Sequence, residues 1–276
     1  MAFEVASVKP TKKPRFPPGI FPLDIGNAKT AGGRFSGTFP VKAFVAFAYK
    51  LLPAEISAKL PESFSQENLF EIEARAPGNP TKDQMRLMMQ SLLAERFKLR
   101  VHFETREGPV FALTLVRPGQ IGPKLRPHGD GPACPDSFDM ESVTTPPRHA
   151  NDPFPPACGS IQSTRAANST LLGARDVTVE AIAEGAIYGM GSLIGEVDKP
   201  VVDRTGLKGS YDFRLELPLG TFSFSLAPPN PSAQAADPKG TPFLNALREQ
   251  LGLKLISSKG PIRKLVIDHI EPPSGN

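Results

Sequence analysis

Hydrophobic residues recur at helical spacing in two segments of the first half of this chain. The first predicts a helix over 40–52 with one buried face; its apolar positions are Val41, Phe44, Val45, Ala48 and Leu52. The second predicts a helix that begins at Pro80-Thr81, with Thr81 as the N-cap. Its stripe consists of Met85, Met88, Met89, Leu92, Leu93 and Phe97. Core packing explains this stripe without a ligand groove.

Shorter segments between these helices have the composition of strands. Strands are expected over 3–8, 34–38 and 70–74, where aromatic and β-branched residues alternate with polar ones. A further pair, 99–105 and 110–116, reads as a hairpin that turns at Glu107-Gly108.

Part of this pattern returns later in the chain. Leu93–Val101 recurs loosely as Leu247–Leu255, and Gly108–Leu113 recurs as Gly260–Leu265. We therefore expect an α+β fold with an internal duplication of a strand-helix-strand-helix-strand-strand unit. Its small, mostly antiparallel sheets would carry helices on one face.

The expected limits of the two repeats follow from this comparison. The first repeat covers 1–126, a proline-rich connector covers 127–158, and the second repeat covers 159–276. In the second repeat the strand over 211–217 matches that over 70–74, Asp176 or Thr178 caps a helix, and 254–257 with 262–270 closes as a second hairpin. Whether the repeats form separate lobes or share one sheet is left open.

Both cysteines, Cys134 and Cys158, lie in the connector. An even count in a proline-rich loop favours a disulfide formed in an oxidising compartment, with two unpaired thiols as the alternative. No CxxC or HxxxH spacing accompanies the pair, so we expect no metal site and no cofactor.

The net charge is +4, and the basic excess is concentrated in the first fifty residues. This excess suits either an anionic partner or ordinary solvated charges. Nucleic acid is not expected, because aromatic stacking positions are missing. No run of about 18 apolar residues is present, so we expect no membrane span. Met1-Ala2 leads directly into the strand over 3–8, as in a chain whose secretion signal was removed, and we expect a secreted or periplasmic location.

A few residues could carry chemistry. Asp198, Asp203 and Asp212 could act as paired carboxylates, although Asp212 aligns with Glu71 and is expected to be an exposed strand residue. His269 is a further candidate, with an ordinary strand histidine as the alternative. The segment 189–195 is rich in glycine but follows a helix, so it is interpreted as a flexible helix exit and not a phosphate loop.

Several strings resemble one family. The clearest are Lys199–Phe213, which reads KPVVDRTGLKGSYDF, and Leu92–Leu99, which reads LLAERFKL. They resemble a soil-associated domain of unknown function that is expanded in Acidobacteria, and the similarity covers nearly the whole chain. The resemblance implies secretion and, in some members, fusion to membrane metallopeptidases similar to beta-lactam sensors. It supplies no catalytic residues.

The signature residues of this family have a structural interpretation here. Asp203 and Thr205 can tie a turn, Gly206 and Gly209 permit tight turns, and Tyr211 packs.

We favour a secreted, non-enzymatic binding or sensor module whose ligand the sequence does not identify; an extracytoplasmic protein and an envelope polymer are the kinds of partner considered. One alternative is a hydrolase of a cell-envelope or extracellular polymer, with Asp198, Asp203 and His269 as the residues to test. The other is an assembly partner that uses exposed strand edges.

Overall fold

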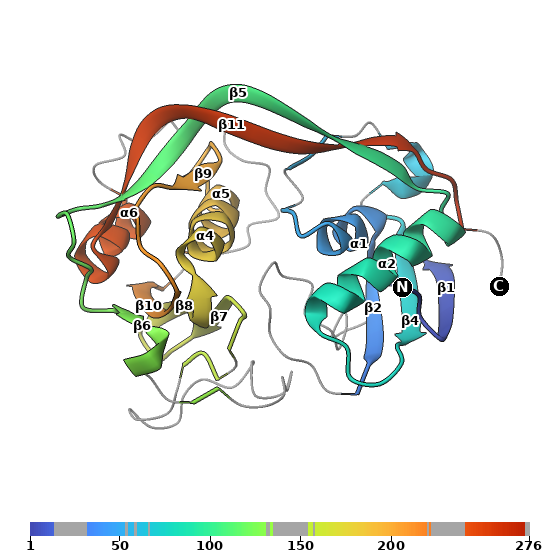
Figure 1. The fold of residues 1–276 in the computed structure, drawn as a ribbon, viewed down its shortest axis with the longest axis horizontal. Coiled ribbons are helices and arrows are strands. Elements are labelled where there is room, and N and C mark those ends of the chain that lie inside the picture. Colours follow the sequence, from blue (N-terminus) through green and yellow to red (C-terminus); the bar gives the residue numbers. More distant parts are fainter. Residues whose placement is uncertain are drawn as a thin grey trace. The chain divides into compact units, whose positions relative to one another are not determined.

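The computed structural model describes residues 1–13, 32–52, 55–57, 60–65, 67–130, 133–134, 154–156, 158–219, 221 and 241–273. They divide into two compact units (Figure 1). Unit 1 consists of Met1–Arg106 with Arg263–Asn276, and unit 2 is Glu107–Ile262. Both units combine helices with small, mostly antiparallel sheets, so the predicted α+β class is confirmed.

Unit 1 contains a three-stranded sheet with the order β1-β4-β2. Its strands are β1 (Val5–Thr11), β4 (Leu69–Arg75) and β2 (Arg34–Pro40), and both outer strands run antiparallel to β4. The helices α1 (Val41–Ala48) and α2 (Lys82–Arg96) cover one face of this sheet (Figure 1).

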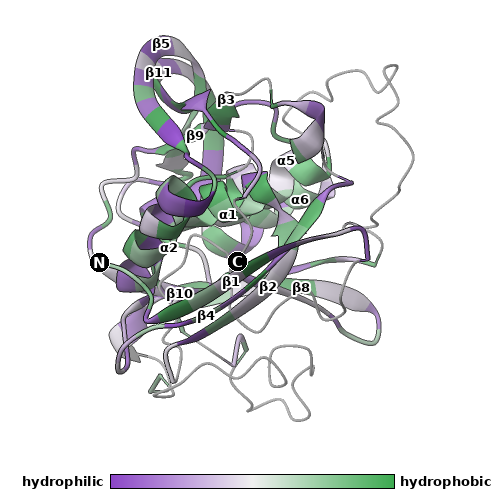
Figure 2. Ribbon diagram, turned by 90° about the vertical axis from the view of Figure 1, so that its right-hand side faces the viewer, coloured by the Kyte–Doolittle hydropathy of each residue, from purple (hydrophilic) through white to green (hydrophobic). Residues whose placement is uncertain are grey.

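The helix predicted to begin at Thr81 forms for the expected reason, whereas the helix predicted over 40–52 ends earlier, at Ala48. Thr81 and Gln84 make a reciprocal capping box, in which the Thr81 side chain accepts from the Gln84 amide and the Gln84 side chain accepts from the Thr81 amide. The predicted apolar stripe of α2 is buried and packs against α1. The helix α1 is itself largely hydrophobic (Figure 2). The described residues of unit 1 also form the short elements β3 (Ile56–Ser57) and the 3₁₀ helix η2 (Glu62–Phe64).

Unit 2 contains a four-stranded antiparallel sheet with the order β6-β10-β8-β7. Its strands are β6 (Leu125–Pro127), β10 (Ser210–Pro218), β8 (Ser169–Thr178) and β7 (Gln162–Arg165). The strand β10 therefore lies between β8 and β6, and β6 comes from the border between the predicted first repeat and the proline-rich connector. The 3₁₀ helix η3 (His128–Asp130) follows β6 directly.

Two helical segments pack on this second sheet. One joins α4 (Val179–Ala181), the π-helix η4 (Ile182–Met190) and α5 (Gly191–Leu193). The other joins α6 (Pro242–Ala246) and the π-helix η5 (Leu247–Leu251). The expected flexible exit at 189–195 is wrong in part, because helical structure continues to Leu193. Of the two caps considered, Thr178 caps α4 by accepting from the Ala181 amide.

The two predicted hairpins are wrong. Each is a single continuous strand, β5 (Arg100–Leu115) or β11 (Leu253–His269), and the two pair with each other. Gly108 and Gly260 make no turn. An added Cβ at Gly108 would lie 2.5 Å from Ile262, and one at Gly260 would lie 3.1 Å from Val110. These glycines therefore serve close packing between the strands.

Each long strand also gains a parallel neighbour. The strand β3 pairs with β11 at Leu265, and β9 (Val201–Asp203) pairs with β5 at Phe111–Leu113. β5 begins in unit 1 and ends in unit 2, whereas β11 begins in unit 2 and ends in unit 1. The repeat limits inferred from sequence, 1–126 and 159–276, describe similarity rather than packing and stay a prediction.

Candidate functional site

The predicted signature residues lie at the end of β9, in the connection that follows and at the start of β10, where Tyr211 is buried as expected. The Asp203 carboxylate accepts from the Thr205 amide at 2.8 Å, and the Thr205 hydroxyl accepts from the Leu207 amide at 3.1 Å. Gly206 and Gly209 have φ of 75° and 83°, the left-handed region that glycine tolerates best. The side chain of Asp203 is thus occupied by its own turn.

The other residues proposed for chemistry are paired locally. Asp198 is exposed and lies 3.9 Å from the Lys199 ammonium. The Nε2 atom of His269 lies 2.7 Å from a carboxylate oxygen of Glu271. His269 belongs to unit 1, whereas Asp198 and Asp203 belong to unit 2. Each of the three is engaged with a residue near it in the sequence, so the hydrolase alternative gains no convergent set from them.

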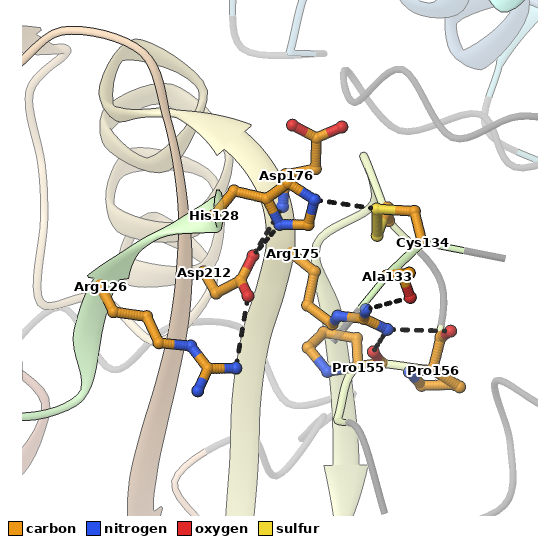
Figure 3. A network of polar contacts seen from close by, with 10 residues as sticks. Arg126, His128, Ala133, Cys134, Pro155, Pro156, Arg175, Asp176 and Asp212 are labelled. Carbon is orange, nitrogen blue, oxygen red and sulfur yellow. Dashed lines mark hydrogen bonds and ion pairs between the residues drawn. A yellow bond between two sulfur atoms is a disulfide. The ribbon is translucent and has the colours of Figure 1, made fainter. Parts of the chain in front are cut away.

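A polar network that the sequence did not reveal lies on unit 2 around Asp212 (Figure 3). The Oδ1 atom of Asp212 lies 2.6 Å from Nδ1 of His128 and accepts from the Asp176 amide at 3.0 Å. Its Oδ2 atom accepts from the Arg126 guanidinium at 3.4 Å. Three donors thus converge on one carboxylate.

The burial of Asp212 results from a β-bulge. Tyr211 pairs with Val177 and Phe213 with Ala174, so that Arg175 and Asp176 together lie opposite Asp212. The expectation that Asp212 is an exposed strand residue is wrong, since the residue is only 5% exposed. Asp176 has φ of 52° at the bulge, which aims its amide at the Asp212 carboxylate.

The disulfide between Cys134 and Cys158 is present and borders this network. The Nε2 atom of His128 lies 3.2 Å from Sγ of Cys134 (Figure 3). His128, Cys134 and Cys158 bring three possible metal-ligand atoms within 4.8 Å of one another. Because the sulfurs are bonded to each other, they are not available as thiolate ligands in this state.

Arg175 holds the two cysteine-bearing segments together. Its guanidinium donates to Ala133 O at 2.8 Å, to Pro155 O at 3.4 Å and to Pro156 O at 3.5 Å. The residue is 2% exposed, and burial lowers the pKa of the guanidinium, while the charge of Asp212 acts in the opposite direction. Sequence spacing offered no signal for this clamp, which depends on pairing between distant segments.

A second candidate site lies in unit 1. A cavity of about 530 Å³ is lined by residues of β1, β2 and β4, including Arg34, Glu73 and Arg75. Arg34 and Arg75 are directly opposite each other in the β2–β4 register. The alternating residues Phe35 and Ala74 belong to the core under the helices, so the two guanidiniums lie on the other face of the sheet.

One wall of this cavity is shaped by a tight backbone contact. Gly33 has φ of 62°, and an added Cβ there would lie 2.7 Å from Gly78 O and 2.8 Å from Ala76 O. The adjacent Gly32 amide donates to the Asn79 side chain at 2.8 Å. These contacts fix the start of β2, and with it Arg34, against the end of β4.

Across the described parts of the chain, no helix has the length and apolar character that crossing a membrane requires. No curated protein and no solved structure shows a significant match to the chain. A family model described as a protein of unknown function, DUF3738, matches residues 42–270 and so spans both units. The chain therefore belongs to the DUF3738 family.

Proposed function

We propose that this chain is an extracytoplasmic binding module that recognises an anionic group through Arg34 and Arg75. The observation that carries the proposal is that Arg34 and Arg75 are directly opposite each other on neighbouring strands and that both line one open cavity. Like charges directly opposite on a sheet destabilise it unless something neutralises them. Within the described residues neither Arg34 nor Arg75 forms an ion pair.

The chemistry of the two side chains suggests the class of ligand. A guanidinium presents a planar set of donors that matches the oxygens of a carboxylate or a phosphate, and two of them can hold one such group from both sides. A carboxylate or phosphate group of an acidic polymer is therefore a suitable ligand for this pair of arginines.

The volume of the cavity also agrees with a binding role. About 530 Å³ lies within the range of roughly 300–1,000 Å³ that is typical of small-ligand sites. The strands that line it are fixed by antiparallel pairing on both sides of β4, so the site needs little ordering when a ligand binds.

The disulfide supports the extracytoplasmic part of this proposal, because such bonds persist in oxidising compartments. The resemblance to soil-associated sequences, some of which are implied to be fused to membrane metallopeptidases, favours binding or sensing over catalysis. An acidic envelope or extracellular polymer is thus the class of partner that we propose.

The proposal can be tested by measuring the affinity of the full chain for polygalacturonate and for poly(glycerol phosphate). The double variant Arg34→Gln/Arg75→Gln should bind the better of the two at least about a hundredfold more weakly, since each of the two charged hydrogen bonds contributes about 1.5–3 kcal/mol and about 1.4 kcal/mol corresponds to tenfold. The matched control is Arg165→Gln/Arg248→Gln, which removes the same charge from exposed positions of unit 2.

The salt dependence of binding provides a second criterion. The affinity for the polymers should fall as ionic strength rises, because exposed charge–charge contacts are screened by salt. Equal affinity of the wild type and the Arg34/Arg75 double variant for both polymers would refute the proposal. An equal loss of affinity in the control variant would show that binding depends only on net charge, and it would refute the proposed site.

A further inference from the structure

We propose that the Cys134–Cys158 disulfide is a redox-active site that exchanges with dithiols, with Cys134 as the leaving group and His128 as its partner. This inference is independent of anion binding, which concerns unit 1. It depends on three observations. The imidazole of His128 lies next to one sulfur, the Arg175 guanidinium contacts both cysteine-bearing segments without using the sulfurs, and the two cysteines are partly exposed.

The imidazole of His128 joins the sulfur of Cys134 to a buried carboxylate. Its Nε2 atom lies 3.2 Å from the sulfur and its Nδ1 atom lies 2.6 Å from Asp212 (Figure 3). When the ring carries both protons, Nδ1–H donates to Asp212 and Nε2–H donates to the sulfur. A purely structural disulfide does not require this alignment of sulfur, imidazole and carboxylate.

The alignment has a chemical consequence when the S–S bond breaks. A thiolate is stabilised by a neighbouring imidazolium, and a more stable thiolate leaves faster in thiol–disulfide exchange. His128 contacts Cys134, so Cys134 is the better leaving group and Cys158 is the sulfur that an incoming thiolate attacks.

The two cysteines would stay close after reduction. Arg175 donates to Ala133 O, next to Cys134, and to the carbonyls of Pro155 and Pro156, which precede Cys158. These contacts do not involve sulfur, so they persist when the bond is broken. The site is therefore arranged to close again on oxidation, and the positive guanidinium also favours a nearby thiolate.

Access and charge agree with this role. Cys134 and Cys158 are both partly exposed, and so is His128. The charged side chains of this network are Arg126, Arg175, Asp176 and Asp212, with Asp176 at the bulge. Reactive cysteines are typically found in such partly exposed surroundings with cationic neighbours.

The exchange proceeds in two balanced steps. A thiolate of a dithiol attacks Sγ of Cys158, a mixed disulfide forms, and the electron pair of the S–S bond passes to Cys134, whose thiolate faces His128. The second thiolate of the dithiol then attacks the mixed disulfide and releases Cys158. The dithiol loses two electrons and becomes a disulfide, and the protein gains two electrons and two protons as a pair of thiols.

The first test compares the folded and the unfolded wild-type chain. The rate of reduction by dithiothreitol is followed by thiol alkylation and mass spectrometry, with a chelator present to exclude metal capture by the thiols. We expect faster reduction in the folded chain than in guanidinium, where His128 is no longer positioned. Slower reduction in the folded chain would overturn the proposal, and this comparison needs no variant.

Two variants and a control then assign the effect to the imidazole. His128→Ala should slow reduction of the folded chain by about tenfold, and Asp212→Asn should slow it to a smaller extent. His269→Ala removes a histidine that pairs with Glu271 in unit 1, and it should leave the rate unchanged. Unchanged rates in His128→Ala would overturn the role of His128.

The identity of the attacked sulfur is a separate readout that a merely structural histidine would not influence. Mixed disulfides trapped with glutathione and mapped by peptide mass spectrometry should lie on Cys158. Trapping mainly on Cys134 would contradict the assignment of Cys134 as the leaving group.

Discussion

The Nδ1 atom of His128 lies 2.6 Å from Oδ1 of Asp212, although 84 positions separate the two residues in the sequence. His128 follows the short strand β6, and Asp212 lies at a bulge of β10, which is the neighbour of β6 in the sheet. The contact joins a segment of the proline-rich connector to the central strands of unit 2. It therefore matters for stability as well as for the proposed exchange at the disulfide.

Replacement of Asp212 by alanine should destabilise the protein by about 3 kcal/mol, because removal of one member of a buried charged network leaves the others unpaired. His128, Arg126 and the Asp176 amide all lose their acceptor. Urea unfolding with the disulfide intact measures the change. Glu107→Ala, at an exposed position of β5, is the control and should change the free energy of unfolding by less than about 0.5 kcal/mol.

Gly122→Ala should be destabilising because backbone atoms occupy the space that a side chain would need. An added Cβ at Gly122 would lie 2.5 Å from Gln250 O, from Gly252 N and from Leu251 C. Overpacking of this kind costs about 1–3 kcal/mol. Gly129→Ala is the matched control, since nothing lies within 4 Å of the place that its Cβ would take. Equal melting temperatures of the two variants would contradict this interpretation.

The titration of His102 should depend on Asp268. A hydrogen bond from the imidazole to Asp268 raises the pKa of His102 above its usual range, against a smaller lowering by desolvation, and the charge of Asp268 and the contact with Glu104 add to the rise. The charged imidazole is thus favoured by folding, so its contribution to stability is complete below the unfolded pKa and is lost as pH rises through the folded pKa. In Asp268→Asn, an NMR titration should find the midpoint at lower pH; an unchanged midpoint would exclude the contact.

Removal of the disulfide should lower stability through the unfolded state. The Cys134 and Cys158 positions are separated by 24 in the sequence, and closing a loop of this size contributes about 3 kcal/mol in the chain-entropy model. The double variant Cys134→Ser/Cys158→Ser should lose about this much in urea unfolding. A loss below about 0.5 kcal/mol would show that Arg175 and the Asp212 network alone hold the two segments.

The elements that local patterns specify were predicted well. The helix α2 has a strong apolar period and a cap at Thr81, and both features belong to the segment itself. The strand β4 was likewise found from its alternation of polar and apolar residues.

The errors concern interactions between distant segments. Gly-Pro at 108–109 and at 260–261 is a turn signal in isolation. In the structure the strands that contain them, β5 and β11, pair with each other, and each strand continues through its Gly-Pro without a turn. The burial of Asp212 depends on the pairing of β10 with β6 and on a bulge in the register with β8, neither of which alternation along β10 can reveal. The disulfide was predictable from cysteine count, whereas the position of His128 at its sulfur was not.

The most direct measurement for the proposed anion site is an NMR titration of the full chain with inorganic phosphate and with galacturonate, observed at the arginine Nε–H groups. Both ligands carry the chemistry that the cavity beside Arg34 and Arg75 should recognise. We predict that the signals of Arg34 and Arg75 shift together and reach saturation, while that of Arg165 stays in place. If neither Arg34 nor Arg75 moves, or if all exposed arginines shift alike without saturation, unit 1 does not bind anions at this cavity.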